Sequence, residues 1–164
     1  MGERWPNVRT PRGERLALVR TVELTGGTET EMGDRANVVV LDEHAPVFLY
    51  THWGGEDLPT DLANALARGK DRWDDGPYLT RIIFCEMVKG QEGETTGFGI
   101  STVLCDNEHP LLVVRVSSKH VWAVPEKYAD DLYAYLDDHP TEGITFSDAT
   151  PDALQRLFGT EDEA

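Results

Sequence analysis

From residue 36 onward the chain alternates between short β-branched runs and apolar patterns with helical spacing. Residues 36–41 (Ala-Asn-Val-Val-Val-Leu) and 47–51 are predicted strands, because Val, Phe and Tyr fit a pleated, half-buried surface. The turn-forming segment between them predicts a hairpin. Similar runs predict three more strands, which we interpret as an antiparallel meander: residues 97–105, 111–116 and 120–124.

Two central helices are predicted between the second and third strands. In residues 58–68 three leucines recur at every fourth position, Asp57 is placed to cap the start, and Gly69 to end the helix. Residues 77–89 are apolar nearly all round, with Asp75 as the expected cap, which is typical of a buried helix. Beyond residue 125, apolar spacing predicts an amphipathic helix around 128–136. A short helix is predicted after Thr150-Pro151, ending at Gly159.

These elements predict an α+β fold with the order β-β-α-α-β-β-β-α. The mostly antiparallel sheet of about five strands is expected to carry the two central helices on one face and a C-terminal helical addition. Three segments are expected: an extension (1–31) that is disordered or lies upstream of a natural start at Met32, a core domain (32–125), and an acidic helical segment packed on it (126–164).

The charge is strongly negative and unevenly distributed. The net charge is −15, yet residues 1–31 are neutral with five arginines, while residues 126–164 are the most acidic part. This charge argues against binding to nucleic-acid phosphates or anionic membranes. Three readings stay open: solubility, a cation site, or an acidic surface that docks on a basic protein, including by imitating a nucleic-acid backbone.

The chain has no apolar run of membrane-spanning length and no signal-peptide core, which predicts a cytoplasmic protein. Its two cysteines, Cys85 and Cys105, do not form a disulfide framework and are read as buried free thiols.

The first candidate site is Tyr50-Thr51-His52-Trp53-Gly54-Gly55, where a strand ends and a helix begins. His52 suits a general base or a metal ligand, and Trp53 suits stacking on a ligand. Gly54 and Gly55 leave the backbone open to close approach. The alternative is structural, with a hydrogen-bonded histidine and a tucked aromatic ring closing the edge of the sheet.

Glu86, Cys105 and Asp106 are the other candidate catalytic residues. Glu86 falls in the apolar arc of its helix, so it must be paired, protonated or metal-bound, and an ion pair is the favoured reading. The expected partners are Arg81, Arg35 or Arg115. Cys105 could act as a nucleophile with His52. A hard metal could use Asp106, Glu108 or Glu86. The alternative is a buried strand cysteine followed by a turn.

Arg72 and Trp73 follow the first central helix. Because one short helix returns the chain, we expect them near His52 and Trp53, where the four would form a mixed aromatic and charged patch for a protein or small ligand.

Four segments resemble a family of small uncharacterised prokaryotic and phage-associated proteins: residues 32–40 (Met-Gly-Asp-Arg-Ala-Asn-Val-Val-Val), 50–55 (Tyr-Thr-His-Trp-Gly-Gly), 72–84 (Arg-Trp-Asp-Asp, then Pro-Tyr-Leu and Arg-Ile-Ile-Phe) and 99–108 (Gly-Ile-Ser-Thr, then Leu-Cys-Asp-Asn-Glu). The likeness covers residues 32–116, supports Met32 as the start and implies no activity.

The sequence predicts a protein-binding or regulatory module, and the resemblance adds a phage or mobile-element setting. The alternatives are a small hydrolase or metal-dependent enzyme using His52, Glu86, Cys105 and Asp106, and an acidic nucleic-acid mimic. The partner is expected to be another protein. The sequence assigns no cofactor, metal, substrate or oligomeric state.

Overall fold

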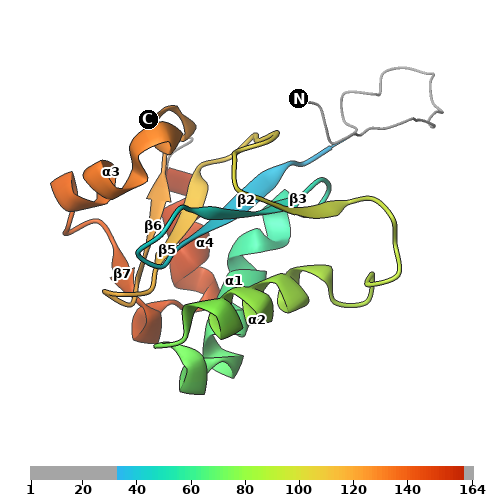
Figure 1. The fold of residues 1–164 in the computed structure, drawn as a ribbon, viewed down its shortest axis with the longest axis horizontal. Helices are drawn as coiled ribbons and strands as arrows, with labels where there is room; N and C mark the ends of the chain where they lie inside the picture. Colours follow the sequence, from blue (N-terminus) through green and yellow to red (C-terminus); the bar gives the residue numbers. More distant parts are fainter. Residues whose placement is uncertain (1–32, 161–164) are drawn as a thin grey trace. The chain divides into compact units, whose positions relative to one another are not determined.

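The computed structural model describes residues 33–160. The expectations for the segment 1–31 and for a start at Met32 lie outside the described residues. Within them, a single mixed sheet separates two groups of helices (Figure 1).

Six strands form the sheet, in the order β4-β3-β2-β5-β6-β7. Their bounds are β2 (Ala36–Leu41), β3 (Val47–Thr51), β4 (Phe98–Ser101), β5 (Leu111–Arg115), β6 (His120–Val124) and β7 (Ile144–Thr145). Neighbouring strands are antiparallel except β2 and β5, which run parallel. The predicted hairpin of β2 and β3 is confirmed.

The predicted meander of the last three strands is wrong in one respect. β5 and β6 do form a hairpin, but β4 stops at Ser101 and pairs with β3 at the edge of the sheet. The chain then returns through residues 102–110 to β5, which lies beside β2 at the centre. Four of the five β5 residues are buried, and such a strand needs a covered, central position on both faces.

Residues 33–160 contain four α-helices, together with short 3-10 segments. The α-helices are α1 (Leu58–Arg68), α2 (Gly76–Val88), α3 (Leu132–Asp138) and α4 (Pro151–Thr160). The 3-10 segments are η2 (Gly55–Asp57), η3 (Lys70–Arg72), η4 (Glu126–Asp131) and η5 (Phe146–Asp148). The two central helices therefore begin and end within one residue of their predicted bounds.

The sheet has a hydrophobic core on each face. On one face, Val38 and Leu49 pack with residues of α1, α2 and α4, such as Leu62. On the other, Val39 and Phe48 pack with α3. The α+β class and the two central helices on one face are as predicted, and the C-terminal helices divide between the two faces (Figure 1).

Of the residues predicted to begin or end helices, some take that role and others do not. Asp75 caps α2 by accepting a hydrogen bond from the Tyr78 N–H at 3.2 Å, as expected. Asp57 precedes α1 but its side chain makes no capping bond. Gly159 lies inside α4 rather than ending it.

The acidic C-terminal segment contributes to both cores. Leu132 and Leu136 belong to the core under α3, and Leu154 and Phe158 belong to the core under α1 and α2. Removing everything after Val124 would therefore expose both faces of the sheet, so truncation cannot test nucleic-acid mimicry by this segment.

None of the helices within residues 33–160 combines the length and the apolar content that crossing a membrane requires.

We predict that Leu154→Ala destabilises the protein by about 2–5 kcal/mol, because it removes a fully buried side chain from a packed core. Gln155→Ala, one position along the same helix and exposed, is the control and is expected to change stability by less than about 0.5 kcal/mol. Urea unfolding followed by circular dichroism measures both. Equal stability of the two variants would show that α4 is not part of the core.

Candidate functional site

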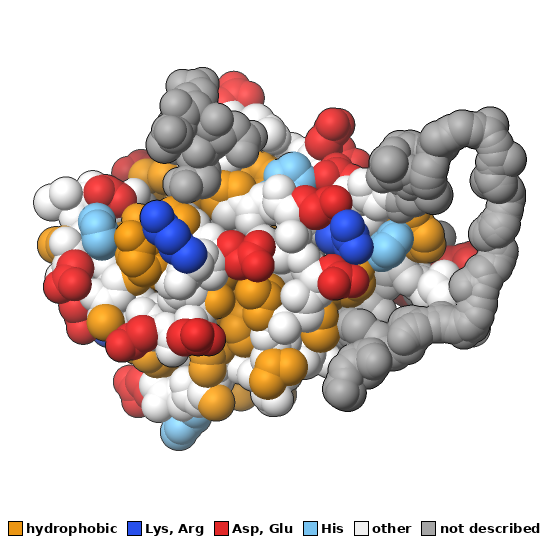
Figure 2. Space-filling view, turned by 90° about the horizontal axis from the view of Figure 1, so that it is seen from above, with side chains coloured by type: hydrophobic (Ala, Val, Ile, Leu, Met, Phe, Trp, Pro, Cys, Tyr) orange, Lys and Arg blue, Asp and Glu red, His pale blue; other side chains and the backbone are white. Residues whose placement is uncertain are grey.

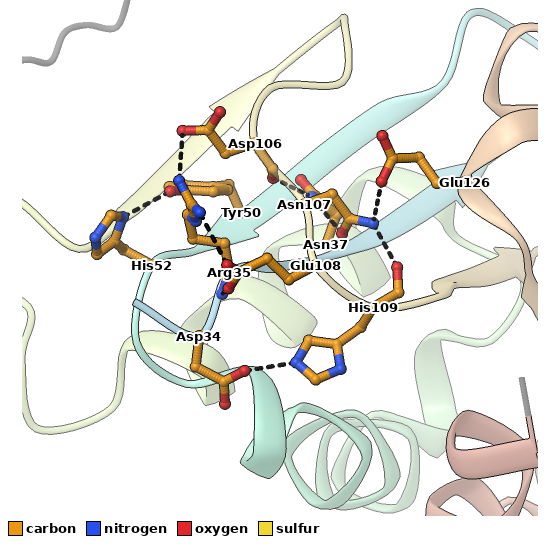
Figure 3. A network of polar contacts seen from close by, with 10 residues as sticks. All are labelled: Asp34, Arg35, Asn37, Tyr50, His52, Asp106, Asn107, Glu108, His109 and Glu126. Carbon is orange, nitrogen blue, oxygen red and sulfur yellow. Dashed lines mark hydrogen bonds and ion pairs between the residues drawn. The ribbon is translucent and has the colours of Figure 1, made fainter. Parts of the chain in front are cut away.

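The parallel pairing of β2 with β5 brings the Asp106–His109 stretch beside the start of β2. In this register Val38 lies opposite Leu112. Before the two strands the chains stay close but leave this register by one position, so that Glu108 contacts Arg35 and His109 contacts Asp34. The result is a polar cluster at one end of the sheet (Figure 3).

Arg35 is the cation of this cluster and is held by two carboxylates. Its guanidinium lies 2.8 Å from Glu108 and 3.6 Å from Asp106. The backbone N–H of Arg35 also donates to Glu108, and the Glu108 N–H donates to the Arg35 carbonyl. The guanidinium hydrogen bond and the backbone N–H together lower the pKa of the Glu108 carboxyl to about 2. The positive charge of Arg35 is thus balanced by carboxylates of the protein itself.

Asp34 connects the start of β2 with the segment that leads into α1. One carboxylate oxygen lies 2.5 Å from His109 Nε2, and the other accepts the Glu56 N–H at 2.7 Å. Its backbone N–H donates to the His52 carbonyl, and its carbonyl accepts the Gly55 N–H. Three separate stretches of chain therefore meet at one aspartate.

Asn37 is the buried polar residue of β2. Its amide donates to the Asp106 carbonyl at 3.0 Å and to the Asn107 side chain at 3.1 Å. Asn107 in turn donates to the His109 carbonyl and to Glu126. These bonds fasten the crossing loop to the sheet. Two buried atoms of the cluster, Asn37 Oδ1 and Arg35 Nε, have no hydrogen-bond partner within the described protein.

His52 lies between this cluster and the surface. Its Nδ1 is 2.8 Å from the Tyr50 hydroxyl, and its ring meets the Trp53 ring edge-on at 4.6 Å. Burial raises the pKa of the Tyr50 hydroxyl, and the Asp106 carboxylate acts in the same direction. Tyr50 is therefore a neutral hydrogen-bonding group that positions the histidine.

Trp53 and the two glycines take different roles. Trp53 is 57% exposed and lies over Gly97, where a Cβ atom would come within 2.9 Å of the indole ring. A Cβ on Gly55 would approach the Asp34 carbonyl oxygen to 2.7 Å and His109 Nε2 to 2.8 Å. At Gly54 it would meet the Thr51 hydroxyl at 2.9 Å. The space beside Gly54 and Gly55 is therefore occupied by atoms of Thr51, Asp34 and His109 rather than left open to a ligand.

Glu86 forms the ion pair that its position predicts, but with a different partner. Arg68 of α1 donates to one carboxylate oxygen from Nε and Nη2, at 3.2 and 3.1 Å. Lys89 lies 3.7 Å from the other oxygen. The pair joins the last turn of α1 to the last turn of α2.

The three partners predicted for Glu86 are engaged elsewhere, so that prediction is corrected. Arg81 lies 3.8 Å from the Cys85 sulfur, Arg35 belongs to the polar cluster, and Arg115 pairs with Asp137 at 2.9 Å. The sequence does not reveal Arg68 as the partner, because it does not show that the last turns of α1 and α2 meet.

The four candidate catalytic residues do not form one set of contacts. His52 and Asp106 belong to the same polar cluster (Figure 3). Cys105 is half-buried, with its sulfur 3.8 Å from the Val103 carbonyl, and Cys85 is exposed, so the predicted burial of both thiols is wrong. Glu86 bonds to Arg68 and Lys89 instead. Across residues 33–160, no group of three or more His, Cys, Asp or Glu side chains is arranged to hold a metal ion.

The predicted patch of His52 and Trp53 with Arg72 and Trp73 is not formed. Trp73 donates to the Leu66 carbonyl and packs on Phe146 at 5.3 Å, beyond the C-terminal end of α1. His52 precedes the N-terminal end of α1, and a helix of 11 residues is about 16 Å long. Arg72 and Trp73 therefore lie near the C-terminal end of α1, whereas His52 and Trp53 lie near its N-terminal end.

Asp61 is a perturbed residue that the sequence analysis did not single out. Burial raises the pKa of its carboxyl to about 6, and the negative charges of Asp57 and Glu86 act in the same direction. The raised pKa could not be predicted from the position of Asp61 in the first turn of α1, because its acidic neighbour Glu86 belongs to α2.

No family model matches this chain, and no curated protein or solved structure does either. The motif resemblance therefore stays a prediction, and the site is interpreted from its own geometry.

We predict that Glu108→Gln reduces the loss of unfolding free energy that occurs as the pH is lowered. The pKa of Glu108 is about 2 in the folded protein, against an ordinary 4.5. Its contribution is therefore complete above about pH 4.5 and is lost as the pH falls towards 2. Urea midpoints between pH 7 and pH 2 should fall less steeply in the variant than in the wild type. Glu94→Gln, in an exposed loop, should retain the wild-type slope. Parallel curves for the two variants would contradict the role of the Arg35 bond.

We predict the opposite sign for Asp61→Asn. The raised pKa means that ionised Asp61 opposes folding, so the penalty grows as the pH rises from about 3.8 through about 6. At pH 7 the variant should be more stable by about 1 kcal/mol, after allowing for screening of this half-exposed carboxyl. The gain should vanish below about pH 3.8, and thermal unfolding at both pH values measures it. A gain that persists at low pH would point to helix propensity instead.

Proposed function

We propose that this chain is a protein-binding module that contacts its partner through a surface formed by Trp53, Ile100 and Val103, called here the β4 edge surface. The observation that carries the proposal is their exposure on and beside an edge strand. They are 57%, 58% and 63% exposed, respectively. Large apolar side chains exposed near one edge of a sheet mark candidate interaction sites.

The three residues come from two segments that meet at β4. Trp53 covers Gly97 immediately before β4, Ile100 stands on β4, and Val103 follows its end, where its N–H bonds to the Ser101 hydroxyl. Tryptophan is enriched at the energetic centres of protein interfaces, whereas valine supplies complementary apolar area. The edge therefore carries an aromatic anchor before β4 and aliphatic side chains on and after the strand.

Residues of the polar cluster hold Trp53 and the start of β4 in place. His52 positions Trp53 by ring contact, and its carbonyl accepts the Asp34 N–H. The His52 N–H donates to the Gly97 carbonyl at 2.9 Å, which joins the base of Trp53 to the start of β4. Side chains held in this way lose little conformational freedom on binding, which favours affinity.

The enzyme alternative has less support in the geometry. A catalytic set requires its members to lie within hydrogen-bond reach around a common cleft. Asp106 and Glu108 are both committed to Arg35, and Glu86 is committed to Arg68. The motif resemblance favours a phage or mobile-element setting for the binding module.

Site-specific photo-crosslinking in host cells tests the proposal. With p-benzoylphenylalanine at position 100, we expect one protein to be crosslinked and identified by mass spectrometry. The same group in place of Tyr128, an exposed aromatic residue next to α3, is the matched control and should not capture it. Trp53→Ala should reduce the yield at position 100 by about tenfold, as loss of an anchor does.

Two results would contradict the proposal. The first is the same set of captured proteins from positions 100 and 128. The second is a yield at position 100 that is unaffected by Trp53→Ala while the variant retains the thermal stability of the wild type.

A further inference from the structure

We propose that β4 receives an extended, basic segment of the partner protein as an additional strand of the sheet. This inference rests on the protein-binding role proposed above and specifies the partner's chemistry. Three features of the described chain support it: the position of β4, the composition of β4 and the charge of the residues around it.

β4 is the terminal strand of the described sheet, and its pairing partner is β3 on one side. A terminal strand presents backbone N–H and C=O groups that an added strand can satisfy. Ile100 lies opposite Leu49 in the ladder, so its side chain is on the α1 face of the sheet, beyond the reach of the core. An added strand could place an apolar side chain against it.

The composition of β4 lacks the devices that usually protect an edge. The strand reads Phe-Gly-Ile-Ser, with no lysine, no proline and no inward-pointing charge. The other edge differs, because β7 has only two residues. Short edge strands are themselves a protection against unwanted pairing. The sheet is therefore open to strand addition at β4 rather than at β7.

The charge around β4 specifies a basic partner. Residues 90–110 contain four acidic residues and no lysine or arginine. Glu92 and Glu94 lie exposed in the loop that leads into β4, which extends away from the helices in Figure 1. Asp106 and Glu108 are paired with Arg35, so the acidic charge available to a partner beside β4 is that of Glu92 and Glu94. Opposite charges at the rim of an interface steer association and fix its register.

A second copy of this chain is a less suitable occupant of the same edge. Two copies would each bring a net charge of −15 and would place acidic loops near each other. Figure 2 shows a face on which acidic side chains are spread between exposed hydrophobic ones, with few lysines and arginines. The surface thus favours a cationic partner over a copy of itself.

The probe is a nine-residue synthetic peptide, acetyl-KVKVTVKVK-amide, titrated into the isotope-labelled full chain. We expect saturable binding and slower amide exchange in β4 by about tenfold or more, because an added strand bonds the outward N–H groups. Affinity should fall with added salt, as a charge-steered contact does. The peptide EVEVTVEVE, with the same valines and opposite charge, and KVKPTPKVK, which cannot complete a ladder, should each bind about tenfold more weakly or not at all.

Variants of the protein locate the contact. Ile100→Lys adds a protective charge to the edge and should weaken the peptide by about tenfold. The double variant Glu92→Lys with Glu94→Lys should do the same without touching the strand. The matched control reverses two acidic residues near the other edge, Glu142→Lys with Asp148→Lys, and should retain affinity within about twofold.

Each other outcome overturns the strand-addition proposal. Absence of binding at about 1 mM peptide would do so, as would binding without protection of β4. So would concentration-dependent dimerisation of the free protein with protection of the same amides, which would assign the edge to a second copy. If crosslinking at position 100 succeeds while the peptide fails, the binding role stands and only the strand-like, basic character of the partner is lost.

Discussion

The parallel pairing of β2 with β5 is the constraint on which the rest of this structure depends. It forces the chain to leave β4 at the sheet edge and return to the centre, so that residues 102–110 must run back to the start of β2. The polar cluster follows from this pairing, because it places Arg35, just before β2, beside Glu108 in the segment that leads into β5. An antiparallel meander would have placed β5 beside β4 instead.

Much of the fold follows from local patterns in the sequence. The bounds of the central helices, the first hairpin and the hairpin of β5 with β6 are set by residues close together in the chain. The position of β4 was not predicted, since alternation shows that a segment is a strand but not which strand it joins. The uninterrupted apolar run Leu111–Val114 was the available signal, because a strand that is apolar on both faces is usually central.

The site, like the fold, was predictable where it depends on local sequence and not where it depends on contacts between distant segments. The ion-paired glutamate of α2 follows from its sequence position, whereas the sequence left open whether Trp53 is exposed or tucked against the sheet edge. The identity of the glutamate's partner does not follow from sequence position, since it depends on the contact between two helix ends. Asn37 was a missed signal, because an amide within a β-branched run must find hydrogen bonds in the core.

The parallel pair also bears on how the sheet is assembled. The hairpins of β2 with β3 and of β5 with β6 are local and can form quickly, but α1, α2 and β4 separate them in the chain. Closing that long loop costs entropy before the central pair returns any stabilisation. Until the hairpins dock, β2 and β5 each present an unpaired apolar edge. The time spent in this half-assembled state, rather than the final stability, is then what exposes the chain to aggregation.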